Sequence, residues 1–79
     1  MIIEIYSKEN SPYCVQAETL CKQNAVLIDY KKFMLDEDFT REELFEKFPT
    51  ARTFPQIVVD GESIGGFTEL KELVNSRRT

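Results

Sequence analysis

The sequence of 79 residues predicts one α/β domain in which a mixed four-stranded sheet is flanked by helices. Strand-like and helix-like segments follow one another in the order β-α-β-α-β-β-α. The first β-α-β unit requires a parallel strand pair with a right-handed crossover. The last two strands are joined by Asp60-Gly61, a dipeptide typical of tight antiparallel hairpins. We assign residues 1–79 to this single domain, because no repeat or linker divides them.

The first strand and the first helix follow from local patterns. Residues 2–6 are rich in β-branched and apolar side chains, which predicts a buried strand. Ser11 is a good N-cap and Pro12 suits the first helical position, so a helix begins there and ends near residue 24. One face of this helix is apolar, because it is formed by Cys14, Ala17 and Cys21.

The remaining elements are predicted in the same way. Residues 26–33 and 54–59 read as strands, and residues 62–64 form a short fourth strand. Residues 40–43 form a capping box that begins a short helix, and residues 67–74 have helical apolar spacing. The apolar sides consist of Leu44, Phe45 and Phe48 in the short helix and of Phe67, Leu70, Leu73 and Val74 in the last one.

Composition excludes several classes of function. The net charge of −4 argues against a nucleic-acid surface, and no apolar run approaches the roughly 20 residues that span a membrane. The chain has no histidine, which excludes Ser-His-Asp and Cys-His catalysis and imidazole metal sites, so we predict no metal. Cys14 and Cys21 would lie about 10.5 Å apart along a helix, too far for a disulfide, which fits a reducing cytoplasm.

The segment Ser11-Pro12-Tyr13-Cys14 is the first candidate for chemistry. A helix N-terminus carries partial positive charge, which lowers the pKa of a cysteine there and activates it as a nucleophile. In a Cys-X-X-Cys motif the first cysteine attacks and the second resolves the mixed disulfide. Here Ser11 holds the attacking position and Cys14 the resolving one. From the residues alone, Ser11 is a helix cap, Cys14 fits a redox or a core role equally, and Cys21 is a core residue.

Two further segments could contribute to a site. Pro55 opens a strand, and since only about 5% of X-Pro bonds are cis, the sequence alone favours trans. Gly65-Gly66 allows a ligand to approach the backbone, and the following helix N-terminus can hold a carboxylate. A simple turn before a capped helix explains this second segment equally simply.

Taken together, these segments resemble the glutaredoxin family over nearly the whole chain. The resemblance is carried by Lys8, Pro12-Tyr13-Cys14, Arg52-Thr53-Phe54-Pro55 and Gly65-Gly66-Phe67-Thr68-Glu69. It implies a thioredoxin fold, glutathione as the cofactor, and reduction of protein disulfides or glutathione mixed disulfides. By family analogy, ribonucleotide reductase is a candidate protein substrate. The unpaired cysteines favour a cytoplasmic protein, and we expect it to be a monomer.

The resemblance assigns roles to residues on one side of a glutathione site. Tyr13 would flank the glutathione sulfur. Residues 53–55 would form the cis-proline loop, consisting of Thr53, Phe54 and Pro55, and the backbone of Phe54 would pair with the glutathione cysteine. Lys8 and Arg52 would face the glycine carboxylate.

On the other side, Gly66 and Thr68 would bind the γ-glutamyl carboxylate, while Glu69 would face its ammonium group. The family more often has aspartate at this last position. The larger departure is Ser11, because the family pattern is Cys-Pro-Tyr-Cys and members with one active cysteine keep the first. Ser11 in this chain should therefore remove most of the normal chemistry, which leaves Cys14 without a mixed disulfide to resolve.

Three interpretations of Ser11 remain open at the level of sequence. In the first interpretation, the attacking cysteine of a glutaredoxin was changed to serine in the laboratory, which leaves an impaired enzyme. Alternatively, the serine is natural and the chain is a non-catalytic module that binds glutathione or a peptide. In a third interpretation the hydroxyl donates to a glutathione thiolate, as in serine-type glutathione transferases, although those proteins need a helical second domain that this chain lacks.

Overall fold

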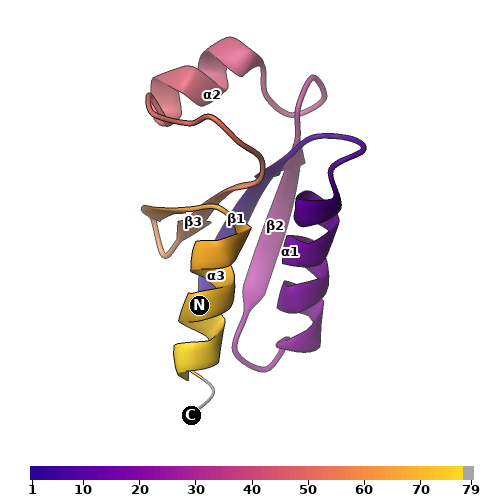
Figure 1. Ribbon diagram of the computed structural model, residues 1–79, viewed down its shortest axis with the longest axis vertical. Coiled ribbons are helices and arrows are strands. Elements are labelled where there is room, and N and C mark those ends of the chain that lie inside the picture. Colours follow the sequence, from indigo (N-terminus) through magenta and orange to yellow (C-terminus); the bar gives the residue numbers. More distant parts are fainter. Residues whose placement is uncertain (78–79) are drawn as a thin grey trace.

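The structure, a computed structural model, describes residues 1–77, so Arg78 and Thr79 of the predicted domain lie outside the described residues. Its elements follow the predicted order (Figure 1). They are β1 (Ile2–Ser7), α1 (Pro12–Gln23), β2 (Asp29–Met34), α2 (Arg41–Lys47), β3 (Gln56–Val59), β4 (Glu62–Gly65) and α3 (Phe67–Arg77). No helix within residues 1–77 has the length and apolar character needed to cross a membrane.

The four strands form one mixed sheet in the order β2-β1-β3-β4. Strands β1 and β2 run parallel, as the first β-α-β unit predicted, and β1 with β3 and β3 with β4 run antiparallel. Figure 1 shows α1 and α3 side by side against the sheet, while the short α2 stands at the end of the sheet where β1 and β2 finish. The predicted α/β class and sheet are confirmed.

Alternation along the strands gives each face of the sheet its own hydrophobic cluster. Ile5 and Ile57 point to the face covered by α1 and α3, where Leu70 packs against them. Tyr6 and Val58 point to the opposite face. The second cluster is completed there by Phe39, Leu44 and Phe48 from α2 and its flanks.

The predicted helix caps are present. The side chain of Ser11 accepts a hydrogen bond from the backbone N–H of Cys14, and Pro12 is the first helical residue. Thr40 and Glu43 form the reciprocal capping box at the start of α2. Both helices therefore begin where the sequence indicated, because a cap is a local interaction of side chains with orphan amides.

Three predicted details were wrong. The second strand begins at Asp29, not at residue 26, because residues 24–27 form a turn and Val26 is 98% exposed. The third strand begins at Gln56, which leaves Phe54 and Pro55 in the preceding loop. Phe45 is exposed rather than part of the buried side of α2, since it lies about 100° around the helix from Leu44.

Candidate functional site

Three segments that are distant in sequence line one groove at the N-terminal ends of α1 and α3. The groove has a volume of ≈ 270 Å³. Its walls come from the first turn of α1, the loop before β3 and the first turn of α3. The lining residues are Tyr13, Thr53, Phe54, Pro55, Gly66, Phe67, Thr68 and Glu69. The structure therefore brings together residues from three of the four segments that carried the family resemblance.

The loop before β3 supplies one wall of the groove. The Phe54–Pro55 peptide bond is cis, so the trans bond favoured by frequency alone was wrong, whereas the resemblance implied the cis bond. The side-chain amide of Gln56 donates to the Thr53 carbonyl at 2.6 Å and supports the loop from behind. A Cβ added at Gly66 would lie 3.4 Å from the Pro55 carbonyl oxygen, which shows how closely the two loops approach.

Glu69 closes the N-terminus of α3 on the opposite wall. Its Oε1 accepts a hydrogen bond from the Gly66 N–H at 2.9 Å. Gly65 has a φ of +111°, and a Cβ there would come within 2.5 Å of the same Glu69 oxygen. In the structure, the Gly66 N–H that the resemblance assigns to a ligand is thus bonded to Glu69. A carboxylate ligand would compete with Glu69 for this amide.

Two aromatic rings form the side of the groove between α1 and α3. Tyr13 is 59% exposed, and its ring centroid lies 6.0 Å from that of Phe67. Phe67, predicted on the buried side of the last helix, also lines the groove, and this second position was not predicted. Its place between Gly66 and Thr68, two predicted ligand residues, was the signal that could have revealed it.

Ser11 and Cys14 lie beside this groove but do not line it. They line a separate cavity of ≈ 130 Å³ together with Lys8 and Ser7. Ser11 is 8% and Cys14 4% exposed, and the Ser11 Oγ accepts from the Cys14 N–H at 3.4 Å. The Ser7 hydroxyl in the wall is buried without a hydrogen-bond partner among the described residues. The serine therefore acts as the predicted cap, and Cys14 is almost completely buried beside it.

The two predicted carboxylate-binding cations occupy different positions. The Lys8 Nζ lies 5.6 Å from the centroid of the Phe54 ring. A residue that lines the small cavity thus contacts one that lines the groove. Arg52 is exposed and lines neither cavity. Their assignment to a glycine carboxylate stays a prediction.

The cysteines are both free, which confirms that Cys14 and Cys21 do not pair. Cys21 is fully buried, as expected for a core residue. Burial, with a smaller contribution from the Glu18 charge, raises the pKa of Cys21 to about 11. Cys21 is therefore a neutral thiol at physiological pH and an unsuitable nucleophile.

Comparison with known proteins agrees with this geometry. The family model for glutaredoxin matches residues 3–64. Glutaredoxin 3 of Escherichia coli strain K12 is 34% identical over 71 residues, which cover 90% of this chain and 83% of that protein. The structure of reduced Escherichia coli glutaredoxin is 30% identical, with a TM-score of 0.83 and coverage of 99% of this chain and 98% of that one.

A more distant structure, a buckwheat glutaredoxin in complex with glutathione, supports the fold alone. It is 22% identical, with a TM-score of 0.76, and the match covers 96% of this chain and 70% of that one. The matched family model spans most of this chain, and the sheet and helices follow the thioredoxin-like arrangement of its relatives. The chain therefore belongs to the glutaredoxin family, which is a family of thiol-disulfide oxidoreductases.

Proposed function

We propose that this chain is a glutathione-dependent glutaredoxin whose turnover is impaired by Ser11 at the position of the attacking cysteine. The observation that carries the proposal is the groove in which Tyr13, the loop of residues 53–55 and the first turn of α3 meet. Its disulfide-containing protein substrates would include ribonucleotide reductase by family analogy. We further propose that the protein is a monomer that works in the cytoplasm.

The groove offers the features that a short peptide with a free carboxylate requires. Its volume of ≈ 270 Å³ is close to the lower end of the range for small-molecule sites, about 300–1,000 Å³. The backbone of Phe54 is available to pair with the peptide backbone of glutathione. The N-terminus of α3 attracts a carboxylate, which would replace Glu69 at the Gly66 N–H. The displaced Glu69 could then face the ligand's ammonium group.

Ser11 interrupts the chemistry and leaves the scaffold intact. With cysteine at this position, its thiolate would attack the glutathione sulfur of a mixed disulfide. The protein sulfur would leave as a thiolate, and a new disulfide would join residue 11 to glutathione. A second glutathione thiolate would then release the enzyme and form oxidised glutathione. A serine hydroxyl is a poor nucleophile without an adjacent base, and the chain has no histidine to provide one.

Restoring the thiol tests the proposal directly. We expect Ser11→Cys to reduce a glutathione mixed disulfide of a small peptide at a rate at least on the order of 10²-fold above the present chain. Thr19→Cys is the matched control, because it adds an exposed thiol to the same helix outside this groove. A folded Ser11→Cys variant that stays at the level of Thr19→Cys would refute glutaredoxin activity.

The second candidate is a module that binds glutathione without redox turnover. It is favoured by the intact cap at Ser11 and by the shielding of Cys14. Calorimetry with reduced glutathione on the present chain tests binding separately from catalysis. Binding here, combined with an inactive Ser11→Cys variant, would select the binding module. The codon for residue 11 in the native gene would distinguish a natural serine from a laboratory change.

A further inference from the structure

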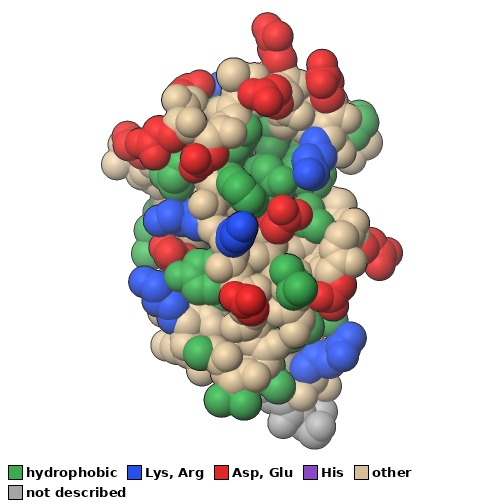
Figure 2. Space-filling view, turned by 180° about the vertical axis from the view of Figure 1, so that it is seen from behind, with side chains coloured by type: hydrophobic (Ala, Val, Ile, Leu, Met, Phe, Trp, Pro, Cys, Tyr) green, Lys and Arg blue, Asp and Glu red, His purple; other side chains and the backbone are tan. Residues whose placement is uncertain are grey.

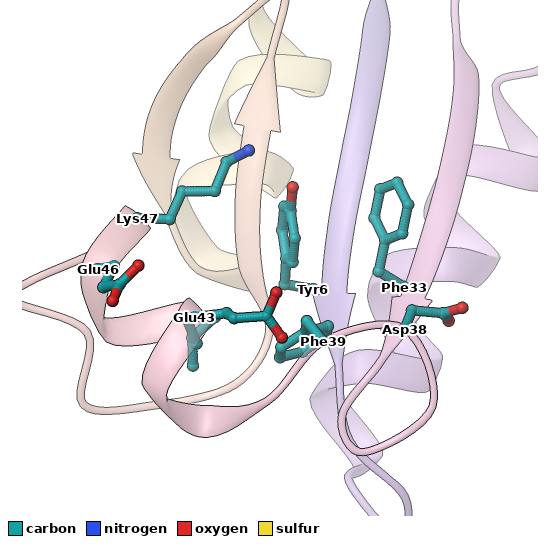
Figure 3. A pocket seen from close by; sticks show the side chains of 8 residues that line it. Tyr6, Phe33, Asp38, Phe39, Glu43, Glu46 and Lys47 are labelled. Atoms are coloured by element: carbon teal, nitrogen blue, oxygen red, sulfur yellow. The ribbon is translucent and has the colours of Figure 1, made fainter.

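A cavity larger than the groove lies on the other face of the sheet. It has a volume of ≈ 490 Å³ and opens between α2 and the ends of β1 and β2 (Figure 3). We call it the α2 cavity. Its lining residues are Tyr6, Phe33, Asp38, Phe39, Glu43, Leu44, Glu46 and Lys47. None of them lines the groove, so the proposed function leaves this cavity without a role.

The floor of the α2 cavity is aromatic. The ring centroids of Tyr6 and Phe33 lie 5.1 Å apart in a stacked arrangement, and Phe39 meets Tyr6 edge-on at 5.4 Å. Leu44 is only 3% exposed and closes the side under α2. Aromatic faces carry partial negative charge, so this floor favours an apolar body that bears a positive charge.

The rim of the α2 cavity is mostly acidic. Its charged side chains are Asp38, Glu43 and Glu46, with Lys47 as the one cation among the lining residues. Two of these carboxylates are fixed in place by backbone amides, since Asp38 accepts from Met34 N–H and Glu43 from Thr40 N–H. Figure 2 shows hydrophobic side chains in a hollow beneath the acidic end of the molecule. The charge around the apolar floor therefore complements a cation.

Lys47 already places a cation in this environment. Its Nζ lies 5.3 Å from the centroid of the Tyr6 ring, and Figure 3 shows the side chain reaching from α2 towards Tyr6. The neighbouring Tyr6 hydroxyl, with a smaller contribution from Glu4, raises the pKa of Lys47. The ammonium group of the protein itself thus marks the position that a ligand cation would take.

We propose that the α2 cavity binds a small organic ammonium compound with an aromatic body. The body would cover Phe39 and Leu44, and the ammonium group would lie near Tyr6 and the Glu43 carboxylate, with Glu46 farther out on the rim (Figure 3). Lys47 is on the rim and would move towards solvent. A volume of ≈ 490 Å³ lies within the usual range for small-molecule sites. The proposal is independent of glutathione and of Ser11, because the α2 cavity shares no lining residue with the groove or with the cavity beside Ser11.

Three probes with the same aromatic body separate charge from hydrophobicity. We would titrate the full chain at pH 7 with phenethylammonium, 2-phenylethanol and phenylacetate and follow backbone amide shifts by NMR. The largest shifts should fall on α2, Tyr6 and Phe39. We expect phenethylammonium to bind about three- to tenfold more tightly than 2-phenylethanol, and phenylacetate most weakly. Equal affinities for the three probes, or shifts confined to other regions, would overturn the proposal.

Two substitutions on α2 sharpen the test. Glu46→Gln should weaken phenethylammonium binding about two- to fivefold and leave 2-phenylethanol unchanged. Lys47→Met should strengthen phenethylammonium binding by a similar factor, because it removes the competing cation. The matched control is Glu42→Gln, which changes the net charge equally on the same helix but outside the cavity. If Glu42→Gln weakens binding as much as Glu46→Gln, only overall charge is involved and the proposed site is wrong.

Discussion

The two faces of the sheet are filled in different ways. Beneath α1 and α3 the buried side chains are almost all aliphatic, and Ile5, Ile57 and Leu70 are completely buried. Beneath α2 the cluster is built around Tyr6, whose ring meets three others at centroid distances of 5.1–5.4 Å. Branched aliphatic chains interdigitate, whereas rings that meet edge-on next to a helix of seven residues leave a cavity. The same four-stranded sheet therefore has a closed face beneath α1 and α3 and an open face beneath α2.

The two candidate binding regions are built on different faces of the sheet. The groove lies where the first turns of α1 and α3 meet the loop before β3, so the closed face holds two of its three walls. Sites on packed elements keep their geometry better than sites on loops alone. The α2 cavity lies on the open face, where Lys47 and Glu46 stand on the rim. We infer that the closed face fixes the groove, whereas the open face can adapt to a ligand.

The largest expected effect is on the stability of the closed face. Leu70→Ala should lower the free energy of unfolding by about 2–5 kcal/mol, because Leu70 is completely buried. Leu44→Ala removes the same atoms on the open face and should cost about 2 kcal/mol, since Leu44 already borders a cavity. Urea unfolding of both variants measures the difference. Equal losses would show that the α2 cavity does not loosen the packing around Leu44.

The sequence predicted the features that depend on local interactions. The caps at Ser11 and Thr40 and the hairpin at Asp60-Gly61 need only neighbouring residues, and all are present. Asp60 and Gly61 both have positive φ, at 50° and 87°, as the hairpin requires. These local signals fixed the order of the elements and therefore the fold class.

Features that depend on distant partners were predicted less well. The apolar Val26 suggested strand, yet pairing with β1 starts only at Asp29, opposite Ile2. The isomer of the Phe54–Pro55 bond is a property of the folded loop, so frequency alone gave the wrong answer. The α2 cavity was not foreseen at all, because its existence depends on how far α2 stands from the sheet. The family resemblance predicted which residues would meet in the groove. Hydrophobic periodicity could not predict this, because it describes only neighbouring residues.

A smaller effect tests how much the Glu69 cap at the start of α3, in the wall of the groove, contributes to the stability of the protein. Gly61→Ala and Gly65→Ala both place a side chain at positive φ, which costs about 1–2 kcal/mol. A Cβ at Gly61 meets nothing within 4 Å, whereas one at Gly65 meets the Glu69 carboxylate that caps α3. We therefore expect the loss for Gly65→Ala to be larger by about 1 kcal/mol. Thermal unfolding of the pair measures it, and identical losses would mean that the Glu69 cap contributes no stability.

The smallest effect concerns the polar contact that joins α1 to β2. Glu18 accepts hydrogen bonds from the Tyr30 hydroxyl at 2.9 Å and from the Lys32 ammonium at 3.2 Å. Burial opposes the charged form, but these two partners outweigh it and lower the pKa of Glu18 from its ordinary value of 4.5. The carboxylate therefore stabilises the fold fully above about pH 4.5, and the contribution is lost as the pH falls through the lowered folded pKa.

Glu18→Gln measures this contribution with little change of shape. Because the ion pair is partly exposed, we expect a loss of about 0.5–1 kcal/mol at pH 7. At a pH below the folded pKa the variant and the parent should be equally stable, since both then carry a neutral group at this position. Urea unfolding at pH 7 and in a descending acid series gives both values. In a Tyr30→Phe background the loss at pH 7 should shrink, because one of the two partners of Glu18 is gone. A loss that is constant with pH would show that the shape of the Glu18 side chain, and not its charge, holds α1 against β2.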